Sequence, residues 1–328
     1  MNSKLSWMMP LLLGSAVALA QESRLDGPVS GLVYDEQAHA IRVMMGVPGA
    51  GYLGASVVAG LDFATVAPNG RSAIALKGGK LSLLRFGAEL QTEAIAENYP
   101  TPSLSSWTAD SDAVALYGAE AGIAVWRKIS TGVEPAGLGN PGALGRVSAL
   151  SLEASTRSVV LVLDGDGSDA VYRATEGSEP ALLARGIDIS AIAVSSSGVY
   201  FADRATHSIS IARDAGGSVE VALLASEALG ITDPVGLAIL GDTLLVASGA
   251  NHELVRLNAS SGELLGRVAL EFTPDRIAAL AMGADGVSPL YSLKARGAAS
   301  DPLEVLDAAR GSVFFVPAAD AVAASVEE

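Results

Sequence analysis

A spacing of just over forty residues recurs along the chain and constrains the fold more than any other feature of the sequence. Short apolar runs that open alike begin at Leu61, Leu104, Val147, Asp188, Val235 and Ile277, so successive starts lie 41 to 47 residues apart. Within each interval, apolar runs are cut by Gly, Ser, Asp and Asn, which is typical of short β-strands joined by turns. A repeat of this length with four strands predicts a propeller blade, which buries its faces only against neighbouring blades.

Two of the repeats align on each other without a gap at an offset of 45 residues. Apolar positions coincide almost throughout the segments that start at Ile192 and Leu237. The identical pairs are Ala193 and Ala238, Ala202 and Ala247, Ala205 and Ala250, His207 and His252, and Gly217 and Gly262. Agreement over this length indicates a true internal repeat.

The better of these repeats resembles a known propeller group. Residues 233–238, 244–247 and 251–257 together resemble a repeat of the NHL and YVTN propeller group. The resemblance is good over residues 188–271 and implies an all-β propeller fold, but it implies no reaction. The Asp usual after the second strand of such a repeat is present as Asp203 and replaced by Ser248.

The repeat predicts the positions of individual strands. In the first full repeat we expect strands at residues 61–68, 72–77, 80–86 and 91–96, and the sixth repeat should end with residues 312–317. Residues 303–306 fit a strand on repeat logic, although Asp301 and Pro302 could also begin a helix that Gly311 stops.

The segments at the two ends of the repeat region bear on how the ring closes. Residues 31–34 and 40–45 form a hairpin-like pair within an N-terminal segment, 21–60, that closes the ring beside six repeats at 61–317. Closure matters because an open ring would leave unpaired strand edges. We therefore favour an all-β propeller of seven four-stranded antiparallel blades. The alternative has six, with the N-terminal pair completing the last blade. Residues 318–328 should fray.

The first twenty residues have the pattern of a secretory signal peptide. Lys4 precedes an apolar core at residues 5–16, and Ala18 and Ala20 offer small side chains for cleavage before Gln21. A membrane anchor would need about 20 continuous apolar residues, whereas Pro10 interrupts this shorter run. We expect an exported protein, periplasmic or extracellular.

Composition excludes several classes of protein. Half of the 328 residues are apolar and 17% are charged, which rules out intrinsic disorder. The chain has no Cys, so disulfides, thiolate zinc sites and a cysteine nucleophile are excluded. A net charge of −15 argues against nucleic acid. No segment after residue 20 is apolar enough to insert in a membrane, and we expect a monomer whose partner is a small molecule or a protein.

Four acidic residues precede inner strands: Asp62, Asp188, Asp233 and Asp275. Loops from the outermost strand of one blade to the innermost strand of the next emerge on one face, together with the loops between the second and third strands. Propeller ligand sites generally lie at that end of the channel, by fold analogy. The four carboxylates could therefore bind a hard cation or a cationic ligand. The commoner explanation is that Asp is a good turn residue.

The densest acidic cluster is residues 164–169, where Asp164, Asp166 and Asp169 are spaced by glycine and serine. This spacing is similar to calcium loops, in which alternate carboxylates turn inward. The cluster lacks the distal Glu of an EF-hand, so a solvated turn is the favoured interpretation. No cofactor is expected, and Ca²⁺ is the one ion that these residues could hold.

The other apparent motifs predict no chemistry. His207 and His252 occupy one repeat position and His39 lies in the N-terminal pair, so we expect them to bond local turns rather than share a zinc ion. Residues 49–54 match GxGxxG but precede no helix, which predicts a Gly-rich turn. Asn258 begins a glycosylation sequon, and Trp126 is predicted to be a core residue.

These observations favour a non-enzymatic exported propeller that binds a small molecule or protein through the face described above. The alternative is a metal-dependent, lactonase-like hydrolase or lyase that uses the channel-mouth acids. Such chemistry needs a cation to polarise a carbonyl and a general base. Glu153, on an inner strand, is the one further acid that the sequence offers for that role.

Overall fold

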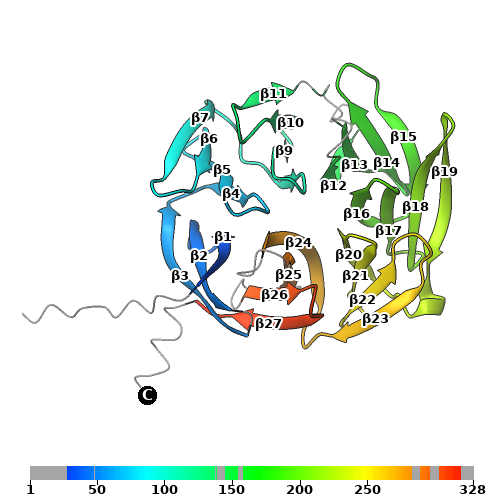
Figure 1. Cartoon of the computed structure of the whole chain (residues 1–328). Helices are drawn as coiled ribbons and strands as arrows, with labels where there is room; N and C mark the ends of the chain where they lie inside the picture. Colours follow the sequence, from blue (N-terminus) through cyan, green and yellow to red (C-terminus); the bar gives the residue numbers. More distant parts are fainter. Residues whose placement is uncertain are drawn as a thin grey trace, which may run out of the picture.

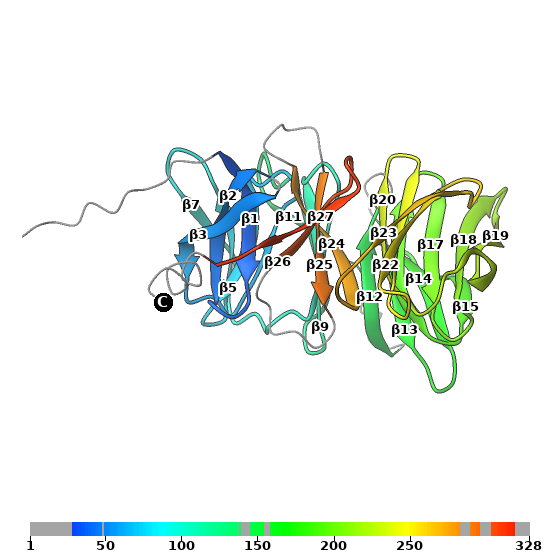
Figure 2. The ribbon, with the colours of Figure 1, turned by 90° about the horizontal axis from the view of Figure 1, so that it is seen from below.

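The chain folds into seven antiparallel sheets arranged radially around a central channel (Figure 1). Figure 2 shows the ring from the side, where the strands run between the two faces of a disc. The computed structural model describes residues 28–47, 49–136, 138, 145–153, 158–282, 289–295 and 303–318. The prediction of a seven-bladed propeller is confirmed, and the six-bladed alternative is wrong.

The strand bounds define the blades. Blade 1 contains β1 (Val29–Asp35), β2 (Ala40–Val47) and β3 (Ala50–Ala59). Blade 2 contains β4 (Phe63–Val66), β5 (Ser72–Lys77), β6 (Lys80–Arg85) and β7 (Gln91–Ala96). Blade 3 contains β8 (Leu104–Trp107), β9 (Ala113–Gly118), β10 (Gly122–Arg127) and β11 (Glu134–Ala136). Blade 4 contains β12 (Arg146–Leu152), β13 (Ser158–Asp164), β14 (Asp169–Thr175) and β15 (Ala181–Gly186). Blade 5 contains β16 (Ile189–Ser195), β17 (Gly198–Asp203), β18 (Ser208–Ala215) and β19 (Ser218–Ala225). Blade 6 contains β20 (Pro234–Leu240), β21 (Thr243–Ser248), β22 (Glu253–Asn258) and β23 (Leu264–Ala269). Blade 7 contains β24 (Pro274–Met282), β25 (Pro289–Ala295), β26 (Leu303–Asp307) and β27 (Ser312–Val316). A short 3-10 helix, Glu227–Leu229, follows β19.

The hydrophobic core lies between the blades. In the four-stranded blades we label the strands a to d from the channel outward. Each of the seven clusters of buried apolar side chains is shared by two adjacent blades. The cluster of Met44, Leu53, Leu280, Leu290, Val305 and Val316 joins blade 7 to blade 1. Because every junction is filled in this way, the ring is closed by side-chain packing.

Short polar side chains connect neighbouring inner strands. Ser105 Oγ and Trp107 Nε1 on β8 both donate to Thr65 Oγ1 on β4, at 3.0 Å. Ser190 Oγ on β16 donates to the carbonyl of Pro234 on β20 at 2.6 Å. Inner strands converge at the channel, and these hydrogen bonds satisfy polar groups that would otherwise lack partners.

The end of the described chain contacts its beginning. The carbonyl oxygen of Pro317 accepts a hydrogen bond from Leu53 N at 2.8 Å, and Ala318 forms a parallel bridge with the same residue of β3. Blade 1 thus gains backbone contact from the segment that follows the last strand. Residues 319–328, most of the tail predicted to fray, lie outside the described residues, as do residues 1–20.

Blade 1 contains the equivalents of strands b, c and d rather than a, b and c. In other blades a carbonyl in the b–c turn accepts the N–H of a residue just after strand d, as Gly79 does from Tyr99 and His252 does from Leu270, both at 2.8 Å. His39, between β1 and β2, accepts in the same way from Leu61, which follows β3, at 2.9 Å. The strand β1 therefore has the register of a b strand, although it is the innermost strand of its sheet.

Most strand predictions agree with the structure. Residues 72–77 and 91–96 are confirmed as β5 and β7, and the strand expected at 303–306 is β26, extended to Asp307. The strand predicted at 61–68 is shorter, Phe63–Val66. The Gly-rich turn predicted at residues 49–54 is wrong beyond its first residue, because β3 starts at Ala50 and Gly51 and Gly54 lie within it. Blade 1 therefore has a third strand that the predicted pair lacked.

Candidate functional site

The inner strands surround a cavity of about 1480 Å³. The side chains of these strands along its wall are mostly small or aliphatic, with Ser, Ala, Leu and Ile prominent. Charged residues lie among its lining residues near the two ends, contributed by turns and by the ends of the strands. We call the end that carries the d–a and b–c loops the channel mouth.

The structure places the four predicted acids at different positions relative to this mouth. Asp188 and Asp275 are exposed and line the cavity. Asp62 is exposed, does not line the cavity, and accepts a hydrogen bond from Gly78 N at 2.6 Å within its own blade. Asp233 is half-buried at the start of β20. Asp188 and Asp233 are brought together, and an arginine joins them.

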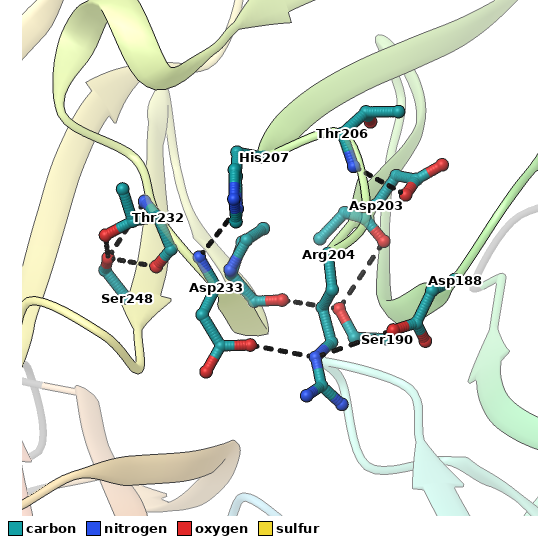
Figure 3. Close-up of polar contacts among 11 residues, drawn as sticks. Asp188, Ser190, Asp203, Arg204, Thr206, His207, Thr232, Asp233 and Ser248 are labelled. Atoms are coloured by element: carbon teal, nitrogen blue, oxygen red, sulfur yellow. Dashed lines mark hydrogen bonds and ion pairs between the residues drawn. The ribbon is translucent and has the colours of Figure 1, made fainter.

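Arg204 is that arginine, and no sequence motif predicted its role. Its Nε lies 2.9 Å from Oδ1 of Asp233 and 3.8 Å from Oδ2 of Asp188, as Figure 3 shows. The side chain lines the cavity, and the terminal nitrogens of its guanidinium point away from both carboxylates (Figure 3). Two of the acids predicted to bind a cation therefore form ion pairs with an arginine of the protein itself.

The b–c turn of blade 5 fixes Arg204 in this position. Asp203, at the end of β17, is 5% exposed and accepts hydrogen bonds from Ile187 N at 2.8 Å and Thr206 N at 3.2 Å. His207 closes the turn with φ +50°, and its Nδ1 accepts a hydrogen bond from Asp233 N at 3.1 Å. Blades 5 and 6 are thus joined at the mouth through backbone as well as side chains.

Each histidine bonds a residue in the loop that leads into the next blade, so the prediction that the histidines bond their own turns is wrong. His39 Nδ1 lies 3.1 Å from the carbonyl oxygen of Leu61, and His252 Nε2 lies 3.1 Å from Thr273 Oγ1. His39, His207 and His252 share a left-handed conformation, with φ between +49° and +52°. Their common repeat position reflects a common turn geometry.

The acidic cluster at residues 164–169 forms the b–c turn of blade 4. Asp169 is buried, its Oδ2 accepting from Ile189 N at 2.7 Å and its Oδ1 from Gly165 N at 3.4 Å. Asp164 lies 3.7 Å from Arg146, and Asp166 is exposed. Within the part of the chain that the structure describes, no three His, Asp or Glu side chains gather as metal ligands.

A second charged network lies at the opposite end of the channel. Glu153 follows β12 and is buried, and its Oε1 accepts from Nε and Nη2 of Arg173 at 3.2 and 3.0 Å. Asp214 accepts from Nη1 of the same arginine at 2.9 Å. Burial alone would lower the pKa of Arg173, but Glu153 and Asp214 outweigh it and raise that pKa above its ordinary value. The guanidinium therefore stays charged and binds blade 4 to blade 5.

Comparison with solved structures places the fold among known propellers. The chain is similar to a functionally unknown protein from Desulfotomaculum acetoxidans DSM 771, with 12% sequence identity and a TM-score of 0.60 over 88% of this chain and 95% of that one. It is also similar to the WD40 β-propeller domain of Doa1, with 13% identity and a TM-score of 0.52 over 79% of this chain and 82% of that one. At these identities the likeness shows the fold alone.

Comparison by sequence adds no family. No family model matches the chain, and no curated protein matches it. In the described residues, no helix has the length and apolar character required to span a membrane.

Proposed function

We propose that this chain is an exported, non-enzymatic binding module whose partner docks at the channel mouth around Asp188, Arg204 and Asp233. The observation that carries the proposal is the position of Arg204, which two carboxylates hold at the edge of a wide cavity. The fold is compatible with this role, since propellers present a rigid ring of loops on one face.

The arrangement favours a ligand with oxygen acceptors. Asp188 and Asp233 contact Arg204 through its Nε, and the terminal nitrogens are directed elsewhere (Figure 3). A guanidinium positioned in this way presents donors in a planar fork that suits a carboxylate or a pair of carbonyl oxygens. We therefore expect a partner that offers such oxygens to the mouth, in place of the cationic ligand that the acids alone suggested.

The hydrolase alternative is less favoured because its parts lie far apart. Asp188 precedes an inner strand and Glu153 follows one, so they lie at opposite ends of the channel. Seven residues of an inner strand such as β16 span about 20 Å at roughly 3.3 Å per residue. A base at that distance could not act on a carbonyl polarised at the mouth, since general bases work within hydrogen-bond reach. The hydrolase alternative is tested directly by whether Ca²⁺ or Zn²⁺ at millimolar concentration raises the melting temperature of the protein.

The binding proposal is tested with ligands selected on the protein. Peptides from a random library are selected on the purified chain, and their affinities are measured by calorimetry for the wild type, Arg204→Ala and Arg71→Ala. Arg71 is exposed in the turn between β4 and β5, on the opposite face, and supplies the matched loss of charge. We expect Arg204→Ala to weaken binding about tenfold or more, as loss of a charged hydrogen bond of about 1.5–3 kcal/mol requires, and Arg71→Ala to leave it unchanged. Selected ligands that are indifferent to Arg204 would refute the proposal.

Export is supported by the sequence of the first twenty residues and has its own test. Expression with the natural N-terminus in a secreting host should yield a protein that begins at Gln21, as determined by mass spectrometry of the intact chain. Retention of Met1 in a cytoplasmic product would contradict it.

A further inference from the structure

The inner edge of β1 has no strand paired to it among the described residues. Blade 1 is ordered β1-β2-β3, so one edge of β1 pairs with β2 and the other faces the position of an inner strand. In the six other blades, the strand of the same register is flanked by strands a and c. Within the described residues, blade 1 therefore has strands b, c and d, and no strand fills the innermost position.

Exposure of β1 differs from that of its equivalents in the way that a missing neighbour predicts. Five consecutive residues of β17, from Val199 to Asp203, are buried, and β5, β9, β13 and β21 show similar buried runs. In β1, by contrast, Val29 is 58% exposed and the last three residues, from Val33 to Asp35, are only half-buried. An edge strand that should be internal is a template for pairing with another extended segment.

Open space adjoins both ends of this edge. Tyr34 and Glu36, at the mouth end of β1, line the central cavity. Residues 29–32, at the other end, line a separate cavity of about 560 Å³ that Leu90 and Phe86 of blade 2 help to enclose. A strand of the length seen in the other inner positions, four to nine residues, would pass between these two spaces.

The mouth end of the edge is acidic. Asp35, Glu36 and Asp62 lie close enough to Tyr34 to raise the pKa of its hydroxyl, an effect to which burial contributes most. Arg42 pairs with Asp35 at 3.1 Å and Lys294 with Glu36 at 3.4 Å, and Lys77 donates to the carbonyl of Ala59 at 3.0 Å. Inner strands run antiparallel to b strands and begin at the mouth. The N-terminal end of a strand added here would therefore meet this negative charge.

We propose that the inner edge of β1 accepts an extended peptide of a partner protein, which pairs antiparallel to β1 and completes blade 1. The peptide carries its free amino group or a Lys or Arg side chain at the acidic end, followed by small and aliphatic residues like those of β16. Main-chain hydrogen bonds supply affinity and alternate side chains supply specificity in this mode of recognition. The inference rests on the proposed binding function and names a partner class for it, but it concerns a different element from Arg204.

The test uses the full chain and a peptide built from its own inner strand. The peptide consists of a lysine followed by the sequence of residues 189–195, labelled at its C-terminus, and its binding is measured by fluorescence anisotropy. The matched control peptide has the sequence of residues 188–195, in which Asp replaces the lysine. We expect the lysine peptide to bind at least tenfold more tightly than the control peptide. The substitution Glu36→Lys should reduce the affinity for the lysine peptide at least fivefold. Because Glu36 is exposed, the melting temperature of this variant should equal that of the wild type. A photo-crosslinker at the centre of the peptide should label β1, β4 or β24.

Several results would overturn the inference. Equal affinity for the two peptides, crosslinks confined to other elements, or no saturable binding at 1 mM would each do so, the last because the edge would then be inaccessible. A dimer that the lysine peptide dissociates would make the occupant a second copy of this chain instead. Arg204→Ala should leave the peptide affinity within twofold. If it abolishes binding, the peptide sits at the channel mouth, and the proposed function survives while the strand-acceptor inference fails.

Discussion

At the residue scale, the buried carboxylate of Asp203 shapes the turn that holds the candidate site. It accepts hydrogen bonds from two backbone N–H groups, those of Ile187 and Thr206, and so connects the d–a loop before blade 5 to the b–c turn of that blade. The equivalent carboxylate of Asp35 accepts from the backbone of its own b–c turn in the same way, and Asp307 does so in the c–d turn of blade 7. The side chain of Asp203 thus fixes the backbone position from which the Arg204 side chain extends toward the channel.

We predict that Asp203→Ala lowers the free energy of unfolding by about 1–3 kcal/mol, because backbone donors lose their acceptor in a partly buried site. Urea denaturation at neutral pH measures the change. Asp166→Ala is the matched control, since Asp166 is exposed in the equivalent turn of blade 4, and its change should stay within about 0.5 kcal/mol. Equal effects of the two substitutions would show that Asp203 does not hold the turn.

Tyr99 gives the molecule a predictable response to alkaline pH. Its ring packs edge-on against Trp126 with centroids 5.7 Å apart, and its buried hydroxyl has no hydrogen-bond partner among the described residues. Burial raises the pKa of Tyr99 to about 12. The folded state therefore keeps this proton after the unfolded chain begins to lose its own near pH 10, and stability should fall as pH rises from about 10 to 12.

Tyr99→Phe removes that linkage, so we expect the variant to be close to wild type at pH 8 and to become more stable than wild type by up to about 2 kcal/mol as pH approaches 12. The measurement is the difference in unfolding free energy at pH 8 and pH 11. A difference that does not change with pH would contradict the burial of the hydroxyl.

At the element scale, the sequence predicted the regular blades well and the irregular one poorly. Residues 72–77 were located correctly because turns bound an apolar run of strand length. Residues 91–96 begin with three polar residues, and their place in the repeat located them. The strand β3 was missed because Gly51 and Gly54 made it look like a turn. Gly51 lies in β3 close to the carbonyl of Met45 on β2, where an added Cβ would approach to 3.0 Å, so packing rather than turn geometry requires glycine there.

The sequence also located the acids without predicting how they are used. Asp188 and Asp233 do approach each other, but Arg204 comes from the b–c turn of one blade and reaches the loop of the next. Such contacts depend on the angle between blades, and the spacing of apolar residues in the sequence does not reveal that angle. The register of β1 could not be predicted for a similar reason, because it is the hydrogen bond between Leu61 and His39 that reveals it.

Closure of the ring depends on β27 and the residues after it. Val316 is fully buried in the cluster shared by blades 7 and 1, next to the backbone bond between Pro317 and Leu53. We predict that Val316→Ala costs about 2 kcal/mol of unfolding free energy, through lost burial and the cavity left behind. Val219→Ala, on the exposed edge strand β19, should change stability by less than about 0.5 kcal/mol. If both variants are equally stable in urea, closure at this junction contributes little.

At the scale of the whole molecule, seven apolar interfaces between adjacent blades stabilise the ring. Each blade buries its faces against two neighbours, so the ring requires no disulfide, and the chain has no Cys. We assign the proposed functions to two places where the repeats differ from one another. These places are the arginine at the mouth between blades 5 and 6, and the inner edge of blade 1.

The central claim is that, within the described residues, the ring closes through a blade whose innermost position holds no strand. Residue-resolved amide hydrogen exchange of the full protein tests this claim most directly. Amides of β17, flanked on both edges, should all exchange slowly. In β1, we expect slow exchange only at the alternate amides directed at β2, with the intervening amides exchanging at least tenfold faster. Uninterrupted protection along β1, equal to that of β17, would contradict the account, because it would mean that the inner position is already filled.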